Sequence, residues 1–259
     1  MKRIEYKYLI PADLAEEFRL RAEPFITRDI IAHRTHSVFY TVRSIYYDTP
    51  QLDSYHEKLE GIPIRKKIRI RGYNQRRDSS VAVLEIKRKQ NQNVWKDRAP
   101  VLFCNIPDLL SSGHIERYVL LHSRTPNAVS DARKFLFHLH RTTIKPQTCV
   151  VYDRIAYHGR FDTSFRLTFD RNLRYALTPA IEELYSEQRM IPERNRDHIM
   201  EIKFCTTIPI WLRSLIELYG LQRRSISKYG LSVDALSRKT RGSQLNERQR
   251  IRSFAMGIM

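Results

Sequence analysis

The chain has 259 residues, 42% of them hydrophobic, enough to bury a sizeable core in one large domain or two small ones. Its 46 Lys and Arg against 28 Asp and Glu give a net charge of +18, which predicts a polyanionic partner. The three cysteines lack the number and spacing of a disulfide framework or a zinc site. No stretch has the length and apolarity of a signal peptide or a spanning helix, so we expect a cytoplasmic protein without a transmembrane segment.

The basic character belongs to the body of the chain. Residues 238–259 carry six Arg or Lys and one Glu, which leaves +13 for the preceding residues. No repeat or low-complexity linker marks an internal boundary. We therefore predict one domain over residues 1–237, followed by a basic, mobile tail at 238–259.

The predicted elements are mostly strands, because apolar and polar residues alternate with period two. Residues 3–11 form the first strand, with Arg3, Glu5 and Lys7 on one face, and a short helix opens after Pro11. Residues 39–50 form the second. Residues 62–71 form the third, and one of its faces carries only cations, namely Arg65, Lys67, Arg69 and Arg71.

The same alternation continues further along the chain. The strand that starts at Val81 carries Glu85, Lys87 and Lys89 on one face, and strands at 148–157, 165–175 and 198–205 follow. Their charged faces present Arg154, Arg166 and the pair Glu201 and Lys203. Amphipathic helices are predicted within 106–140 and at 208–221.

Carboxylates recur beside the cations on three strands far apart in sequence: Glu5 with Lys7, Glu85 with Lys87, and Glu201 with Lys203. A solvated sheet face accounts for any one strand but not for this recurrence. We predict an α+β fold in which a closed antiparallel β-barrel forms a tunnel, with the charged faces inside and helices packed on the outside.

So many like charges in one lumen need a highly charged anion to neutralise them. A triphosphate or a longer polyphosphate supplies that charge. Arg suits fixed, bidentate phosphate contacts, and Lys acts as a mobile point charge. A Glu among them is suited to a divalent metal, Mn²⁺ or Mg²⁺, that bridges phosphates.

The order of these motifs resembles one family. The segments "EYKYLIP", "SIYYDTP", "IPIRKKIRIRGY", "LEIKRKQN", "VYDRIAY", "FRLTFDRNLRY", "MEIKFC" and "SISKYGLSVDAL" are similar to the vacuolar transporter chaperone (VTC) polyphosphate polymerase domain, a branch of the triphosphate tunnel metalloenzymes. The resemblance implies transfer of the ATP γ-phosphoryl group to a growing inorganic polyphosphate chain, with a divalent metal as cofactor.

Carried onto this chain, the resemblance implies several site residues. The residues that it implies to contact phosphate are Lys7, Arg69, Arg71, Lys87, Arg154, Arg166 and Lys228. Ser227 resembles a serine that helps to hold phosphate. Glu201 resembles the metal-binding glutamate. We also expect Lys67, Lys89 and Lys203 to bind substrate, although Lys67 and Lys89 alternatively only flank the tunnel mouth.

Some alternatives stay open. Glu201 is either a metal ligand or a salt-bridge partner of a nearby Arg, and Glu5 and Glu85 are salt-bridge partners first. Arg3 stands where the hydrolytic branches of the superfamily carry a glutamate, which disfavours efficient activation of water. Hydrolysis of tripolyphosphate or a nucleoside triphosphate, and non-catalytic binding of polyphosphate or nucleic acid, are the competing functions. The charged faces of "RKKIRIR" and "EIKRK" carry no aromatic residues, which disfavours nucleic acid. A membrane partner is possible but not encoded here.

Overall fold

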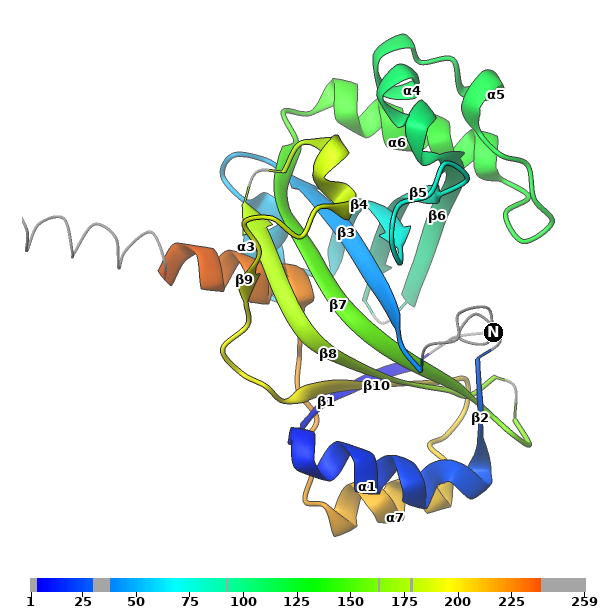
Figure 1. Cartoon of the computed structure of the whole chain (residues 1–259), viewed down its shortest axis with the longest axis vertical. Helices are drawn as coiled ribbons and strands as arrows, with labels where there is room; N and C mark the ends of the chain where they lie inside the picture. The colour runs from blue at the N-terminus through cyan, green and yellow to red at the C-terminus, as the bar shows by residue number, and fades with distance from the viewer. Residues whose placement is uncertain (1–3, 30–37, 92, 163, 178, 239–259) are drawn as a thin grey trace, which may run out of the picture.

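The structure is a computed structural model that describes residues 4–29, 38–91, 93–162, 164–177 and 179–238. The predicted tail beyond Arg238 lies outside the described residues, as does Arg3. The fold is α+β, as predicted, with one antiparallel sheet and helices packed on it (Figure 1).

The sheet contains ten strands. The main path runs β1-β10-β8-β7-β3-β4-β5-β6, and β2 and β9 pair with β7 and β8. The strands are β1 (Ile4–Ile10), β2 (Ile26–Arg28), β3 (Tyr40–Asp48), β4 (Ile64–Tyr73), β5 (Val81–Gln90), β6 (Asn93–Leu102), β7 (Lys145–Gly159), β8 (Arg166–Leu177), β9 (Ile191–Pro192) and β10 (His198–Phe204). The strands predicted from alternation are all present, whereas β2, β6 and β9 were not predicted.

One half of the sheet is covered on its outer face by a helical layer. This layer contains α4 (Ile106–Ser112), α5 (Ile115–Tyr118) and α6 (Ala128–Arg141). Phe135 of α6 packs in one apolar cluster with Ile70 of β4 and Leu84 of β5, all of them buried. The isoleucine face of the basic strand therefore points outward into a core, as predicted.

The other half is covered by α1 (Ala12–Ala22) and α7 (Ile210–Leu218), which lie beside each other below β1 and β10 (Figure 1). Phe18 and Leu212 from these helices pack with Met200 and Ile202 of β10. Helix α7 begins after Pro209, and Gly220 follows it at φ +58°, a left-handed conformation that favours glycine at a helix end. Together the two helical layers bury the apolar face of the sheet.

The sheet curls so that its charged face lines an interior. Register shifts at Tyr46/Tyr47 in β3 and at Val151/Asp153 in β7 mark bulges, which bend and twist strands. The curl brings Glu5 of β1 within 3.5 Å of Lys87 of β5, although these strands lie far apart in the sheet order. The inner wall is thus assembled from both halves of the sheet.

The predicted closure into a barrel is wrong for the residues described. Strands β1 and β6 end the sheet path, and no backbone pairing joins them in the described ranges. Side chains, not backbone hydrogen bonds, connect the two halves across the interior, as in the Glu5–Lys87 ion pair. Alternation in sequence determines which face is inside, but it carries no information about whether two edge strands meet.

Five further helical segments are present in the described residues. They are α3 (Asp53–Leu59), the 3₁₀ turns η1 (Glu23–Phe25), η2 (Phe103–Asn105) and η3 (Ile181–Tyr185), and a helix over residues 228–238 that was not predicted. Tyr229 of this last helix donates a hydrogen bond to Asp48 at the end of β3, 2.6 Å. The helix is thereby fixed against the inner side of the sheet.

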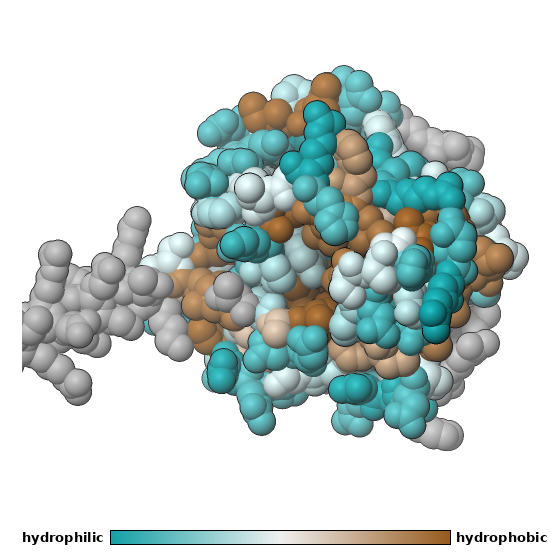
Figure 2. Space-filling model, turned by 90° about the horizontal axis from the view of Figure 1, so that it is seen from above, coloured by the Kyte–Doolittle hydropathy of each residue, from teal (hydrophilic) through white to brown (hydrophobic). Residues whose placement is uncertain are grey.

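The surface is largely hydrophilic. In the view from above, hydrophilic side chains cover much of the molecule and apolar ones gather in separate patches (Figure 2). Every helix in the described part of the chain is too short or too polar to cross a bilayer.

Candidate functional site

The curled sheet encloses an inner chamber of about 370 Å³. Strands β1, β3 to β8 and β10 contribute side chains to it, together with residues 226–228. Eleven lysines and arginines and three glutamates line it: Lys7, Lys67, Arg69, Arg71, Lys87, Lys96, Arg98, Arg154, Arg166, Lys203, Lys228, Glu5, Glu85 and Glu201. With all of them ionised, the wall carries an excess of eight positive charges.

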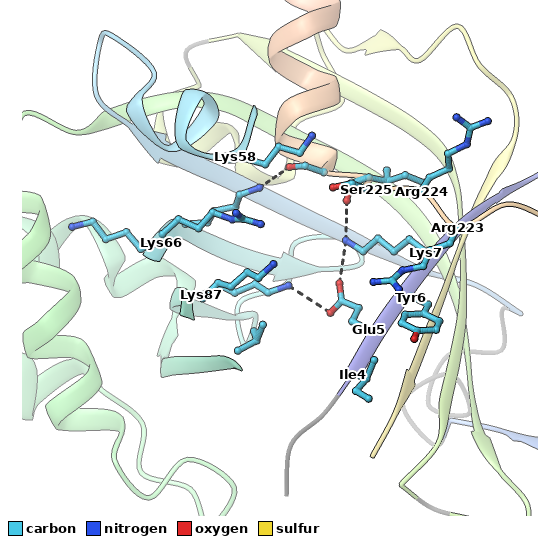
Figure 3. Close-up of a pocket in the computed structure, with 16 residues that line it drawn as sticks. Ile4, Glu5, Tyr6, Lys7, Lys58, Lys66, Lys87, Arg223, Arg224 and Ser225 are labelled. Atoms are coloured by element: carbon cyan, nitrogen blue, oxygen red, sulfur yellow. Dashed lines mark hydrogen bonds and ion pairs between the residues drawn. The ribbon is translucent and has the colours of Figure 1, made fainter. Parts of the chain in front are cut away.

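A second cavity of about 550 Å³, which we call the vestibule, adjoins the chamber (Figure 3). The two share Glu5, Lys7, Lys67, Lys87, Ile226 and Ser227 as lining residues. The vestibule adds six cations, namely Lys58, Arg65, Lys66, Lys89, Arg223 and Arg224, and Glu5 is the one acidic residue among those that line it. The positive potential therefore extends from the chamber into the vestibule.

Three lysines form a row across adjacent strands. Lys87 of β5 lies directly opposite Lys67 of β4 on one side and Lys96 of β6 on the other. Like charges directly opposite each other on neighbouring strands destabilise a sheet. We call Lys67, Lys87 and Lys96 the lysine row, and a bound anion there would offset the repulsion between them.

The pKa values of this row reflect the crowding. Burial, reinforced by Lys7 and Lys87, lowers the pKa of Lys67 from 10.5 to about 7. Burial also lowers the pKa of Lys96 to about 7, against the opposing effect of Glu85, and it lowers the pKa of Lys87. A polyphosphate placed among these ammonium groups would favour their charged forms.

In the next row of residues along the same strands, a carboxylate balances the positive charges. Glu85 lies opposite Arg69 of β4 and Arg98 of β6, forms a close ion pair with Arg69, and lies 3.3 Å from Arg98 Nε. Glu85 is 2% exposed. Burial would raise the pKa of Glu85, but Arg69, Arg71, Lys96 and Arg98 outweigh it and hold the pKa below its usual value.

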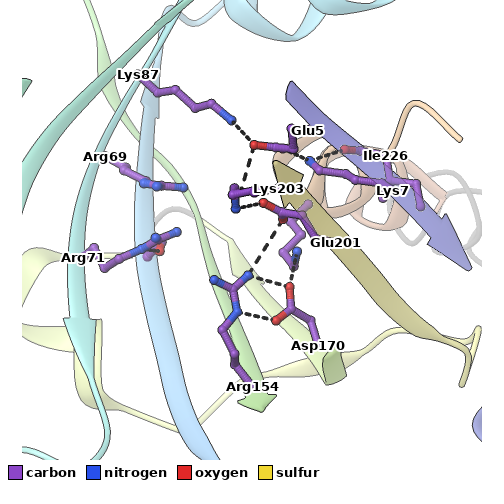
Figure 4. A network of polar contacts seen from close by, with 12 residues as sticks. Glu5, Lys7, Arg69, Arg71, Lys87, Arg154, Asp170, Glu201, Lys203 and Ile226 are labelled. Atoms are coloured by element: carbon purple, nitrogen blue, oxygen red, sulfur yellow. Dashed lines mark hydrogen bonds and ion pairs between the residues drawn. The ribbon is translucent and has the colours of Figure 1, made fainter. Parts of the chain in front are cut away.

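Strands β1 and β10 face this row across the chamber (Figure 4). Glu5 lies opposite Lys203, and Lys7 lies opposite Glu201. Lys203 forms a close ion pair with Glu201, and its Nζ is 3.9 Å from Glu5. Burial would raise the pKa of Glu5, but Lys7, Lys87 and Lys203 together hold it below the usual value.

Asp170 of β8 connects two phosphate-binding candidates. Arg154 of β7 donates to both carboxylate oxygens of Asp170 at 2.5 and 2.7 Å, and Lys228 Nζ lies 2.5 Å away. Asp170 is fully buried. Its pKa is held below the usual value because Arg154 and Lys228 outweigh the cost of burial.

The two residues just before the helix at 228–238 lie at the junction of the two cavities. Lys67 Nζ donates to Ser227 Oγ at 2.6 Å, and Lys7 Nζ donates to the Ile226 carbonyl at 2.9 Å. Ser227 Oγ accepts a hydrogen bond from the Gly230 amide, 3.1 Å, so this serine caps the helix. The positive end of the helix dipole thus adds to the field at the junction.

All twelve residues predicted for the site lie on these walls. Lys89 lines the vestibule, and Lys7, Lys67, Arg69, Arg71, Lys87, Arg154, Arg166, Glu201, Lys203, Ser227 and Lys228 line the chamber. Arg71 donates to Ser44, 3.0 Å, and Arg166 to Asp29, 2.9 Å. Placement on the wall leaves the role of each residue a prediction.

Sequence reasoning missed three charged residues of the site. Lys96 and Arg98 come from the unpredicted strand β6, and Asp170 was not singled out. A signal for Asp170 was present, because it shares the inner face of β8 with Arg166 at a spacing of four residues.

The donors for a metal ion are few. In the described ranges, no three His, Cys, Asp or Glu side chains lie together in a way that could hold a metal. A magnesium or manganese ion on phosphates needs only one or two protein carboxylates. Glu201 fits that role, and Glu5 is linked to it through Lys203. A metal at Glu201 would have to compete with the Lys203 ammonium.

The site is thus the interior of a curled antiparallel sheet, lined mainly by lysines and arginines. The chain belongs to the VTC domain family, whose sequence model matches residues 2–237. A search of curated proteins found no match.

Solved structures resemble the chain at low identity. One is a candidate adenylate cyclase from Bacillus halodurans, 12% identical with a TM-score of 0.46, which covers 88% of this chain and 96% of its own. Another is the PH1819 protein from Pyrococcus horikoshii OT3, 14% identical with a TM-score of 0.45, which covers 90% and 99%.

Proposed function

We propose that the chain is an ATP-dependent polyphosphate polymerase that transfers the γ-phosphoryl group to a polyphosphate chain in the inner chamber. Membership of the VTC domain family supports action on triphosphates and polyphosphate. The eleven lysines and arginines on the chamber wall, against three glutamates, support an anion of high charge as the substrate.

The observation that carries the choice of polymerase is the state of the carboxylates. Glu5, Glu85, Glu201 and Asp170 each form an ion pair with Lys or Arg on the inner wall. The pKa values of Glu5, Glu85 and Asp170 are held low, which makes these groups poor general bases. Water needs a base to become a good nucleophile, whereas a terminal phosphate of polyphosphate is already an anion.

The cations then supply the chemistry. Phosphoryl transfer is catalysed mainly by positioning and by neutralising charge on the transferred group. Arg71 offers a guanidinium for phosphate oxygens, Arg69 and Arg154 add positive charge while also paired with Glu85 and Asp170, and the lysine row adds mobile charges beside them. Repulsion between the donor triphosphate and the acceptor chain is offset because both lie in one positive field.

A divalent metal, when bound, would neutralise phosphate oxygens further, and Glu201 is the residue we assign to hold it. The Glu201→Gln substitution tests this assignment. If Glu201 holds the metal, half-saturation of activity should shift to higher Mn²⁺. If Glu201 only restrains Lys203 and Arg154, the metal dependence should coincide with that of the parent while phosphate affinity changes.

The test of the proposed function is incubation of the protein with ATP and Mn²⁺ or Mg²⁺, with analysis of polyphosphate length on gels and of ADP by chromatography. We expect long polyphosphate to form, with the amount of ADP rising in proportion to the phosphate incorporated. Orthophosphate without chain growth would replace the polymerase with a hydrolase, and tight binding without turnover would indicate a polyphosphate-binding protein.

A further inference from the structure

The outer face of the sheet carries two arginines on the strands that run between the two helical layers (Figure 1). Arg43 of β3 lies opposite Val151 of β7, and Val151 lies opposite Arg174 of β8, so the two arginines occupy one row across three strands. Adjacent strands are about 4.8 Å apart, which places the backbones of the two arginines roughly 10 Å from each other. Neither arginine lines the chamber or the vestibule. The pair is therefore separate from the site described above.

A glutamate lies between the two guanidinium groups. Glu187, in the segment between η3 and β9, has its Oε1 2.5 Å from Arg43 Nη2. Arg174 donates to the same carboxylate from Nε at 2.7 Å and from Nη2 at 2.9 Å. The hydrogen bonds from Arg174, reinforced by the charge of Arg43, hold the pKa of Glu187 below its usual value. We call Arg43, Arg174 and Glu187 the outer clamp.

The single carboxylate leaves one donor of the outer clamp unpaired. Arg43 is 4% exposed, its Nε donates to the Asn74 carbonyl at 2.8 Å, and its Nη1 is buried without a hydrogen-bond partner in the described part of the chain. Asp153 lies 3.9 Å from Arg174 Nη1 and already accepts two hydrogen bonds from neutral side chains. Leaving a buried donor unpaired costs stability. Because Nη1 shares the guanidinium end with the Nη2 that contacts Glu187, it suits a further oxygen at the same place.

The segment that carries Glu187 is exposed and has space beneath it. The side chain of Glu187 is 47% exposed. Arg189, two residues further on, has φ +61°, a left-handed conformation that residues other than glycine rarely adopt. A small cavity of about 20 Å³ separates this segment from Cys149 of β7. These features favour movement of the segment away from the sheet when Glu187 is displaced.

We propose that the outer clamp is a second anion site, built for a single phosphate group, and that Glu187 occupies it when no ligand is bound. A phosphate offers two oxygens to Nε and Nη2 of Arg174 and a third to Nη1 and Nη2 of Arg43, whereas a carboxylate has only two oxygens. Binding displaces Glu187 and frees the segment around Arg189. The phosphate group is that of orthophosphate or of the end of a polyphosphate chain. This site does not depend on the proposed polymerase function.

Tryptic cleavage after Arg189 reports on the outer clamp, because Arg189 is exposed and lies two residues from Glu187. Orthophosphate at matched ionic strength should accelerate this cleavage severalfold, as followed by mass spectrometry. Cleavage after Arg124, exposed in the loop between α5 and α6, is the reference and should stay unchanged or become slower, because a ligand in the chamber stabilises the fold. The same series with long-chain polyphosphate distinguishes a free phosphate from the end of a chain.

Matched substitutions test whether Glu187 competes with the ligand. Glu187→Gln should increase the affinity for orthophosphate severalfold in calorimetry and should make cleavage after Arg189 fast without ligand. Glu182→Gln removes the same charge from an exposed position on η3 and should change neither. Arg174→Gln should make cleavage after Arg189 fast and insensitive to phosphate. Heat from phosphate bound in the chamber is common to all these proteins and cancels in the comparison.

Two results would overturn the proposal. One is cleavage after Arg189 that neither orthophosphate nor polyphosphate accelerates relative to cleavage after Arg124. The other is equal phosphate affinity of the parent, Glu187→Gln and Glu182→Gln, which would make Glu187 a purely structural partner of the two arginines. The comparison of the two glutamate variants decides even if Arg174→Gln does not fold.

Discussion

The outer face of β5 buries Leu84 and Ile86 against α6, whereas its inner face places Glu85 and Lys87 in the chamber. The same strand thus serves two environments with opposite energetics. Burial of apolar area stabilises the outer face whether or not a ligand is present. The inner face carries cations that repel one another and are only partly balanced by carboxylates. The contribution of this face to the stability of the protein therefore depends on whether an anion occupies the chamber. Variants on the two faces should therefore differ in how they respond to ligand.

The largest loss of stability is expected on the inner face. Asp170→Asn removes the charge that holds Arg154 and Lys228, and breaking a buried ion pair costs about 3–5 kcal/mol. Because phosphate can replace the missing negative charge, saturating tripolyphosphate should restore part of the lost melting temperature. Thermal melts with and without ligand check this, and a deficit that tripolyphosphate leaves unchanged would make Asp170 a purely structural residue.

A comparable loss is expected on the outer face, but without any rescue. Leu84→Ala creates a cavity at a residue that is 1% exposed and should destabilise the protein by about 2–5 kcal/mol. Turnover per folded molecule should stay near that of the parent at low temperature. Urea titrations and activity measured on the same samples check this. Selective loss of activity while the protein remains folded would show that the two faces are coupled.

Lys87→Gln should lower turnover about 100-fold, because it removes one preorganised charge from the phosphate path. Its melting temperature without ligand should stay close to that of the parent, because the lysine row loses a repulsive charge while the ion pair with Glu5, which keeps Lys7 and Lys203 nearby, is also lost. The same outcome is not expected for Arg69→Ala, which would leave Glu85 with one of its two close cations removed. A marked drop in melting temperature for Lys87→Gln would contradict its position in a repulsive wall.

The pH dependence should be smaller and should have an unusual sign. The pKa values of Lys67 and Lys96 are about 7 in the folded chain, against an ordinary lysine pKa of 10.5 once the chain unfolds. Between pH 7 and 10.5 the unfolded chain therefore binds more protons, so stability of the ligand-free protein should rise with pH in this window. Melts from pH 7 to 9.5 check this, with Lys67→Met, which removes one titrating group, as the control. A fall in the parent over that range would contradict the crowding of the lysine row.

The sequence was sufficient to predict which faces point inward, because the alternation in β1, β4, β5 and β10 is strict. Strand β6 was missed because its outer face mixes Trp95, Asp97 and Ala99 and its inner face includes Pro100, so no clean alternation is visible. Because this strand was not predicted, Lys96 and Arg98 were not predicted as site residues either. The pairing of Asp170 with both Arg154 and Lys228 joins residues far apart in sequence, and only the three-dimensional fold reveals it.

The central claim is that the inner chamber receives a chain of phosphates among its cations, and calorimetric titration with tripolyphosphate tests it most directly. We expect saturable binding to the parent with proton uptake at pH 8, because binding raises the lowered pKa values of the lysine row. Lys67→Arg, which keeps the charge but cannot titrate, should take up fewer protons. Absence of binding at millimolar tripolyphosphate, or equal proton uptake by parent and Lys67→Arg, would contradict the account.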